Sequence, residues 1–171
     1  ASCPFPNSFI IQNNRDSGPL RRGQINIQQA SQAIADPAER LATEARHILE
    51  RASQDHIWGW LIYSMSDRGR VPDDLLSFPR TDLVVGHRNG RFKFTSLACA
   101  NDLVVSALRR ALRSVLEQDH GKDYASNMLE LLLNALGLPE EEARAIAMRP
   151  LASLPQTSAV SAIQQRNNTQ T

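Results

Sequence analysis

The sequence predicts a mainly all-α fold: a four-helix-bundle-like domain with a small β-hairpin and extended N- and C-terminal arms. Two observations support this prediction. Apolar residues recur at spacings of three and four along several segments, the period of an amphipathic helix. Aromatic residues make up 5% of the chain against 42% hydrophobic residues, so small and aliphatic side chains must fill the core. With 171 residues, we expect an arm over 1–22, one helical domain over 23–155 and a polar tail over 156–171.

The best-defined helix start lies at Asp36, an N-cap residue followed by Pro37 at the first helical position and Glu39 at the third. Apolar residues then repeat along one face, at Leu41, Ala45, Ile48, Leu49 and Ala52. The next apolar stretch, 54–66, fits a buried helix or a strand, and we favour the helix. Residues 67–81 contain Gly69, Pro72 and Pro79, which predict a loop.

The second half of the chain carries the strongest helical pattern. Thr95 or Ser96 can cap a helix whose apolar stripe extends to Leu116. A further helix ends at Gly137, a residue favoured just after a helix C-terminus, and a short helix follows over 140–148. Between the two halves, residues 83–85 and 91–94 flank Asn89-Gly90, a pair typical of tight β-turns, so we expect a β-hairpin there.

Composition and motifs exclude several classes of function. Nineteen basic and eighteen acidic residues give a net charge of +1, so attraction to nucleic acid would need a local patch. The chain has no catalytic motif, and its four histidines lack metal-ligand spacing, so we expect no enzyme, no metal and no cofactor, with the histidines at the surface or in helix caps. No apolar run approaches the roughly 20 residues of a membrane span, so no membrane partner is expected.

The two cysteines, Cys3 and Cys99, are too few for a structural zinc site or a disulfide scaffold. Cys99 lies beside an apolar helix start, which favours a buried, unreactive thiol. A single Cys3–Cys99 disulfide in a secreted helical bundle is the alternative.

Three arginines, Arg109, Arg110 and Arg113, lie opposite the apolar stripe of the strongest helix. Guanidinium groups gathered on one face suit phosphate binding, which makes them candidate RNA ligands. The alternative is a solvated helix face on which Glu117 pairs with Arg113 at i+4. Additional basic contacts are predicted at Arg21, Arg22, Arg88 and Arg91.

The segment from Ser77 to Leu116 resembles the coat proteins of rod-shaped plant RNA viruses, the tobacco mosaic virus type. The matching motifs are Phe78-Pro79, Phe92-Lys93, Asp102, Leu103-Val104 and Ala107-Leu108. The family places RNA-contacting arginines just beyond this helix, where this chain has Val115 and Glu117. The resemblance implies a structural capsid protein that self-assembles as a homo-oligomer or filament, binds RNA, and occurs in the virion or host cytoplasm.

A rival resemblance lies near the N-terminus. Gly18-Pro19-Leu20-Arg21 is similar to the arginine-finger motif of bacterial effectors that act as GTPase-activating proteins for Rho-family GTPases. It implies that Arg21 would stabilise charge on the transferred phosphate. Those effectors carry Thr four residues after the arginine, whereas this chain has Ile25. The coat subunit, the GTPase-activating effector and the secreted bundle are therefore three hypotheses for function.

Overall fold

The computed structural model describes residues 31, 33–67, 78–117, 121 and 123–151, and every regular element in that part of the chain is an α-helix. The helices are α2 (Pro37–Gln54), α3 (His56–Asp67), α5 (Phe78–Arg88), α6 (Leu97–Glu117), α7 (Tyr124–Ala135) and α8 (Glu140–Ala147). The mainly all-α prediction is therefore confirmed. The predicted N-terminal arm and the predicted C-terminal tail lie outside the described residues.

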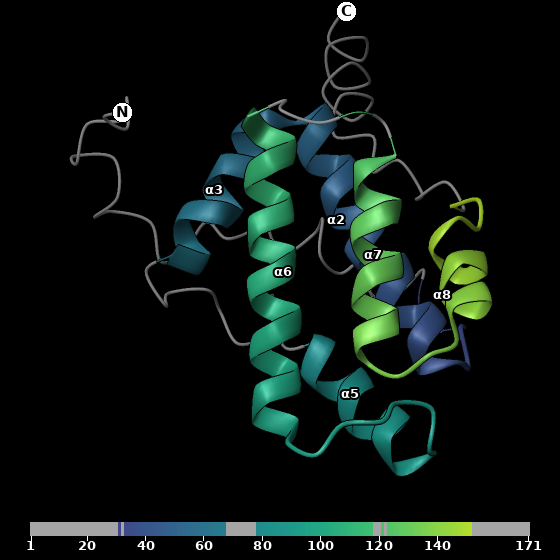
Figure 1. Ribbon diagram of the computed structural model, residues 1–171. Coiled ribbons are helices and arrows are strands. Elements are labelled where there is room, and N and C mark those ends of the chain that lie inside the picture. Colours follow the sequence, from purple (N-terminus) through teal and green to yellow (C-terminus); the bar gives the residue numbers. More distant parts are fainter. Residues whose placement is uncertain (1–30, 32, 68–77, 118–120, 122, 152–171) are drawn as a thin grey trace, which may run out of the picture.

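Helix α2 lies at the centre of the fold, where it packs against each of the other five described helices. The two antiparallel helices α6 and α7 stand side by side in front of it, and α8 packs on the far side of α7 (Figure 1). The predicted cap forms, because the Asp36 carboxylate accepts a hydrogen bond from the Ala38 N–H, with Pro37 in the first turn. The predicted apolar stripe of α2 is buried.

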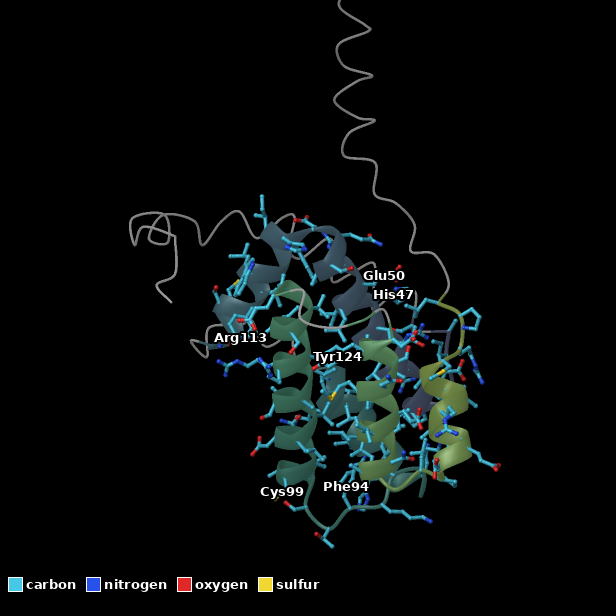
Figure 2. The ribbon with its side chains drawn as sticks, turned by 45° about the horizontal axis from the view of Figure 1, so that its top comes forward. His47, Glu50, Phe94, Cys99, Arg113 and Tyr124 are labelled. Carbon is cyan, nitrogen blue, oxygen red and sulfur yellow. The ribbon has the colours of Figure 1, made fainter. Side chains whose placement is uncertain are left out.

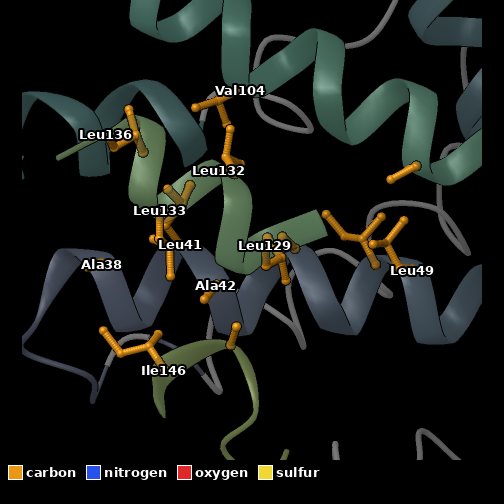
Figure 3. Close-up of a cluster of buried hydrophobic side chains, with 14 of the residues drawn as sticks. Ala38, Leu41, Ala42, Leu49, Val104, Leu129, Leu132, Leu133, Leu136 and Ile146 are labelled. Carbon is orange, nitrogen blue, oxygen red and sulfur yellow. The ribbon is translucent and has the colours of Figure 1, made fainter. Parts of the chain in front are cut away.

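The core is aliphatic, as the composition predicted. Figure 3 shows Leu41 and Ala42 of α2 meeting Leu129 and Leu133 of α7, while Val104 of α6 meets Leu132 of α7. Leu41, Leu129, Leu133 and Val104 have no exposed side-chain surface. The ambiguous stretch 54–66 is helical, as favoured, and it forms most of α3.

The predicted β-hairpin is wrong. Residues 83–85 belong to α5, and the described residues of 91–94 form no strand. Asn89-Gly90 ends this helix instead: Gly90 adopts φ +68°, the Gly90 N–H donates to the His87 carbonyl, and the Arg91 N–H donates to Gly86. These two bonds form a Schellman motif, which needs the same positive φ as a tight β-turn. The Asn-Gly signal was real, but it marked a helix C-terminus.

Other boundaries follow the predicted chemistry. Gly137 (φ +97°) ends α7 with the same pair of hydrogen bonds. The Gly137 N–H donates to the Asn134 carbonyl, and the Leu138 N–H donates to the Leu133 carbonyl. Ser96 caps α6 through a 3.3 Å hydrogen bond from the Cys99 N–H to its hydroxyl. The loop predicted over 67–81 ends too late, because α5 already begins at Phe78 with Pro79 in its first turn, a position that proline favours.

Candidate functional site

A row of charged and polar side chains lines one face of α2, beside its apolar stripe. Its members recur at spacings of four, three and four, so they project from the same side of the helix. Two of them are buried, Glu44 with 5% and His47 with 3% of its surface exposed. Together with one acid from α5 and one indole from α3 they form what we call the polar seam: Arg40, Glu44, His47, Arg51, Asp82 and Trp58.

One end of the seam is an ion pair between α2 and α5. The Arg40 Nε donates to Asp82 Oδ1 at 2.6 Å, and its Nη1 donates to the Ile34 carbonyl at 2.8 Å. Asp82 is 2% exposed, and its second oxygen, Oδ2, has no hydrogen-bond partner. Burial raises the pKa of Asp82, although the bond and charge of Arg40 oppose this shift. The pair therefore leaves one buried acceptor free.

Glu44 lies one helical turn further along α2. Its Oε1 accepts a hydrogen bond from the Ser31 hydroxyl, while Oε2 is buried without a partner. Burial raises the pKa of Glu44 to about 7, and the negative charge of Asp82 acts in the same direction. The Ser31 bond and the Arg40 charge oppose the shift. Near neutral pH this carboxyl is thus balanced between its protonated and ionised forms.

The rest of the seam continues toward α3. His47 has a buried Nε2 without a partner, and burial lowers its pKa, which favours the neutral imidazole. The Arg51 guanidinium lies 4.6 Å from the centre of the Trp58 ring, a cation–π contact. Trp58 is 5% exposed, and its Nε1–H has no acceptor.

Unpaired polar atoms are concentrated in this seam. Six buried side-chain atoms lack a hydrogen-bond partner among the described residues, and four of them are Asp82 Oδ2, Glu44 Oε2, His47 Nε2 and Trp58 Nε1. An unpaired buried polar group costs about 1–3 kcal/mol, so such groups are rare and need an explanation. Two of these four atoms belong to α2, one to α3 and one to α5, so we take this cluster as a candidate ligand-binding site.

A separate groove of about 680 Å³ lies on another side of α2, where that helix meets the ends of α6 and α7. In Figure 2, Glu50 lies on α2 and Tyr124 at the start of α7, both of which line this groove. Glu50 and Ser53 on its wall are exposed to solvent. None of the four unpaired seam atoms belongs to a residue that lines the groove, so we place the candidate site in the seam.

The three arginines predicted to bind RNA are not part of the seam. Arg113 donates from Nε to Glu117 at 2.7 Å, and Arg110 lies 3.9 Å from the same carboxylate. Arg109 and Arg113 lie over the Tyr63 ring, with their guanidinium carbons 5.5 and 6.0 Å from its centre. The i+4 pairing with Glu117, the alternative given by the sequence, is thus present. RNA binding by these residues is not tested by the structure.

The additional basic residues separate into three cases. Arg21 and Arg22 lie outside the described residues, and Arg88 is exposed at the end of α5. Arg91 is an internal link: it pairs with Asp36 at 2.7 Å and with Glu142 at 2.7 Å, which connects the start of α2 to α8. The hydrogen bond to Asp36 raises the pKa of Arg91.

Two sequence predictions about single residues are corrected. Cys99 is a free, exposed thiol near the start of α6, at the end of that helix opposite Arg113 (Figure 2), and is not buried. The next residue, Ala100, packs inward, whereas the Cys99 side chain lies on the outer face. Cys3 lies outside the described residues, so the Cys3–Cys99 pairing is untested. His47 is buried, whereas surface or capping positions were expected for the histidines.

Sequence reasoning missed the seam residues. Arg40, Glu44, His47 and Arg51 follow the same helical period as the apolar stripe, but polar residues with this period are normally a solvated face. Nothing in the pattern says that α3 and α5 contact this face through Trp58 and Asp82. Among the described residues, no group of three or more His, Cys, Asp or Glu side chains could hold a metal ion, and no helix is long and apolar enough to cross a membrane.

Comparison with known proteins gives a consistent result. The family model described as "Tetracyclin repressor-like, C-terminal domain" matches residues 36–149. The chain is also similar to the crystal structure of RolR in complex with its ligand resorcinol, with a TM-score of 0.66 and 25% identity over 80% of this chain and 69% of that one. Ligand-free RolR gives a TM-score of 0.64 and 25% identity over 80% and 71% of the two chains. No curated protein matches the sequence.

These matches overturn the functional hypotheses drawn from the sequence. The resemblance to viral coat proteins is wrong, and with it the capsid function and the virion localisation. The GTPase-activating effector and the secreted bundle are contradicted by the same matches. Two of the motifs behind the coat-protein resemblance have local structural causes instead. Phe78-Pro79 begins α5, and Phe92 of Phe92-Lys93 is a buried ring that follows the end of that helix.

Proposed function

We propose that this chain, which belongs to the tetracycline-repressor-like family, contains the ligand-binding domain of a transcriptional regulator. Regulators of this family sense ligands and are not enzymes, in agreement with the prediction from the sequence. They bind DNA, so the family does not support the RNA partner predicted from the coat resemblance. The observation that carries the proposal is the cluster of four unpaired buried atoms that α2, α3 and α5 contribute to the polar seam. We further propose that the helical domain spans 23–155, which includes every described residue.

The ligand would occupy the polar seam between α2, α3 and α5. Unpaired groups in a buried site discriminate well, because a ligand that lacks the matching donor or acceptor leaves them unpaired. RolR was crystallised with resorcinol, a small aromatic diol. We therefore take resorcinol as the first probe for this chain.

The two tryptophans allow a direct test of the site. Trp58 belongs to the seam, whereas Trp60 is half-buried and packs edge-on against Tyr63 with ring centres 5.7 Å apart. Trp60→Phe leaves Trp58 as the only indole, and Trp58→Phe is the matched control that retains Trp60. We expect resorcinol to change the emission of the Trp60→Phe protein in a saturable way and to leave the Trp58→Phe protein unchanged. A response confined to Trp60 would contradict a ligand in the seam.

Regulators of this family are homodimers, which is consistent with the self-association predicted from the sequence. We propose that α6 and α7 form the interface. Val104 and Leu132 lie together between these antiparallel helices (Figure 3). The preceding residue on each helix is turned by about 100°, and in an antiparallel pair both turns lead to the same side. Leu103 and Leu131 therefore share one outer face, where they are 46% and 67% exposed.

The interface predicts a clean separation of variants. Leu131→Glu places a charge in a contact that should be dry, so we expect it to convert the dimer to a monomer in size-exclusion chromatography with light scattering. Ile57→Glu is the matched control, since Ile57 is 83% exposed but lies on α3, away from this face. A dimer that survives Leu131→Glu and is lost with Ile57→Glu would move the interface to α3.

A further inference from the structure

The groove beside α2 has room for a small molecule and a lining of mixed chemistry. Its volume of about 680 Å³ lies within the range of roughly 300–1,000 Å³ that is usual for ligand sites. Such sites combine an apolar lining with a few placed polar groups. Here the apolar part comes from α2, α6, α7 and the residues after α8, as Leu49, Val115, Ala125 and Leu151.

Arg46 is the cation of this groove, and the fold holds it in place without neutralising it. Its Nη1 donates a hydrogen bond to the carbonyl of Arg149, just after α8. Among the described residues, no carboxylate forms an ion pair with this guanidinium, and Glu50 acts on it only through its charge. Burial lowers the pKa of Arg46, and the charge of Glu50 opposes this shift. A half-buried cation in this state is stabilised by an anion.

Glu50 does not supply that anion, although it also lines the groove. Its Oε1 accepts a hydrogen bond from Gln54 Nε2 at 3.5 Å. Gln54 lies one helical turn beyond Glu50, whereas Arg46 lies one turn before it, so the carboxylate is turned away from the guanidinium. Glu50 is also exposed, so water screens its charge.

The first turn of α7 adds a second feature that favours an anion in the same groove. Ala125 and Ser126 line the groove, and the N-cap residue of their helix, Asp123, makes no side-chain cap hydrogen bond. No acceptor among the described residues receives the backbone N–H of Ala125 or Ser126. Free N–H groups at the start of a helix carry partial positive charge and favour negative groups.

We propose that this groove is a second ligand site, and that it binds a small organic anion with one carboxylate on an apolar body. The carboxylate pairs with the fork of the Arg46 guanidinium, whose planar donors match two carboxylate oxygens. The apolar body packs against Leu49 and Val115. The groove is separate from the polar seam, so this inference does not rest on the ligand proposed there.

Three probes with the same ring system and different charges test the class. They are 2-naphthoate, which is an anion, the neutral 2-naphthamide, and the cationic 2-naphthylmethylammonium. Calorimetric titration measures their affinities in low salt. We expect naphthoate to bind at least about tenfold more tightly than the amide, and the ammonium probe to bind most weakly.

Two variants on the same wall of the groove should change the naphthoate affinity in opposite directions. Arg46→Gln should weaken naphthoate to about the affinity of the amide, because it removes the cation. Glu50→Gln should strengthen naphthoate roughly two- to fivefold, because it removes a screened like charge. Naphthamide should respond little to either variant.

Further variants control for folding and for net charge. Arg46→Lys keeps the charge but loses the fork, so we expect an intermediate affinity for naphthoate. It keeps the test valid if circular dichroism shows that Arg46→Gln is unfolded. Arg88→Gln is the matched control, since it removes one positive charge at an exposed residue that does not line the groove, and it should leave all three affinities unchanged.

The outcomes separate the class of ligand from the site. Equal affinity for naphthoate and naphthamide would overturn the anion class. Equal losses of naphthoate affinity in Arg46→Gln and Arg88→Gln would overturn the site, because the effect would then come from net charge alone. Absence of saturable binding by all three probes would overturn both. The response of Trp58 to resorcinol tests the seam independently of these results.

Discussion

The two buried faces of α2 have opposite chemistry. The apolar face packs Leu41, Ala45 and Ile48 against the other helices, and the polar face buries Glu44 and His47 just as deeply. Both faces are covered because α2 lies at the centre of the fold and contacts all the other described helices. The two faces of the amphipathic helix α2 are therefore both buried, but one packs apolar side chains and the other holds unpaired polar atoms. The first stabilises the domain, and the second is where we propose that a ligand binds.

The largest expected effect lies on the apolar face. Leu41 has no exposed surface, and Figure 3 shows it beside Leu133 of α7. Leu41→Ala should lower the free energy of unfolding by about 2–5 kcal/mol, because it removes buried methyl groups and leaves a cavity. Urea denaturation measures this loss. Ile57→Ala is the control, since its side chain is 83% exposed and should cost far less. Equal losses from both variants would mean that the face of α2 is not the core.

On the polar face, we expect a substitution to stabilise the protein. The folded-state pKa of Glu44, about 7, lies above its ordinary value of 4.5, so between these values the folded protein binds more protons than the unfolded chain. The contribution of Glu44 to the free energy of unfolding is fully present below pH 4.5 and is lost as the pH rises to about 7. Glu44→Gln removes the titration. Relative to the wild type, the free energy of unfolding of the variant should therefore rise by on the order of 3 kcal/mol as the pH increases from 4.5 to 8.

The measurement is the difference in unfolding free energy between variant and wild type at several pH values, which cancels the titration of other groups such as Asp82 and His47. Glu50→Gln, at an exposed position of the same helix, should show the same pH dependence of the unfolding free energy as the wild type. A Glu44→Gln protein whose stability falls relative to the wild type as the pH rises would contradict the buried, unpaired state of this carboxyl.

The same contrast explains how much of the molecule could be predicted from the sequence. The helix starts at Asp36 and Ser96 and the end at Gly137 have short-range chemical causes, so local patterns located them. Asn89-Gly90 misled because a positive φ serves both a β-turn and a helix end, and only the packing of α5 against α2 decides between them. The polar seam depends on Asp82, 42 residues from Arg40, meeting α2 in space, and no local pattern contains that contact.

The smallest effect is expected at the arginines of α6, which test whether a charge on a helix face matters only when it is buried. Arg113 is 49% exposed and pairs with Glu117 at 2.7 Å, a contact that water can replace. Arg113→Gln should leave the urea midpoint and the Trp58 response to ligand unchanged, whereas the buried Arg40–Asp82 pair joins two helices of the site. The test is to compare denaturation curves of Arg113→Gln and wild type in low and high salt. A large loss of stability that salt does not reduce would show that the Tyr63 contact, and not the ion pair, holds α3 against α6. Unchanged curves would place the important charges of this domain on α2.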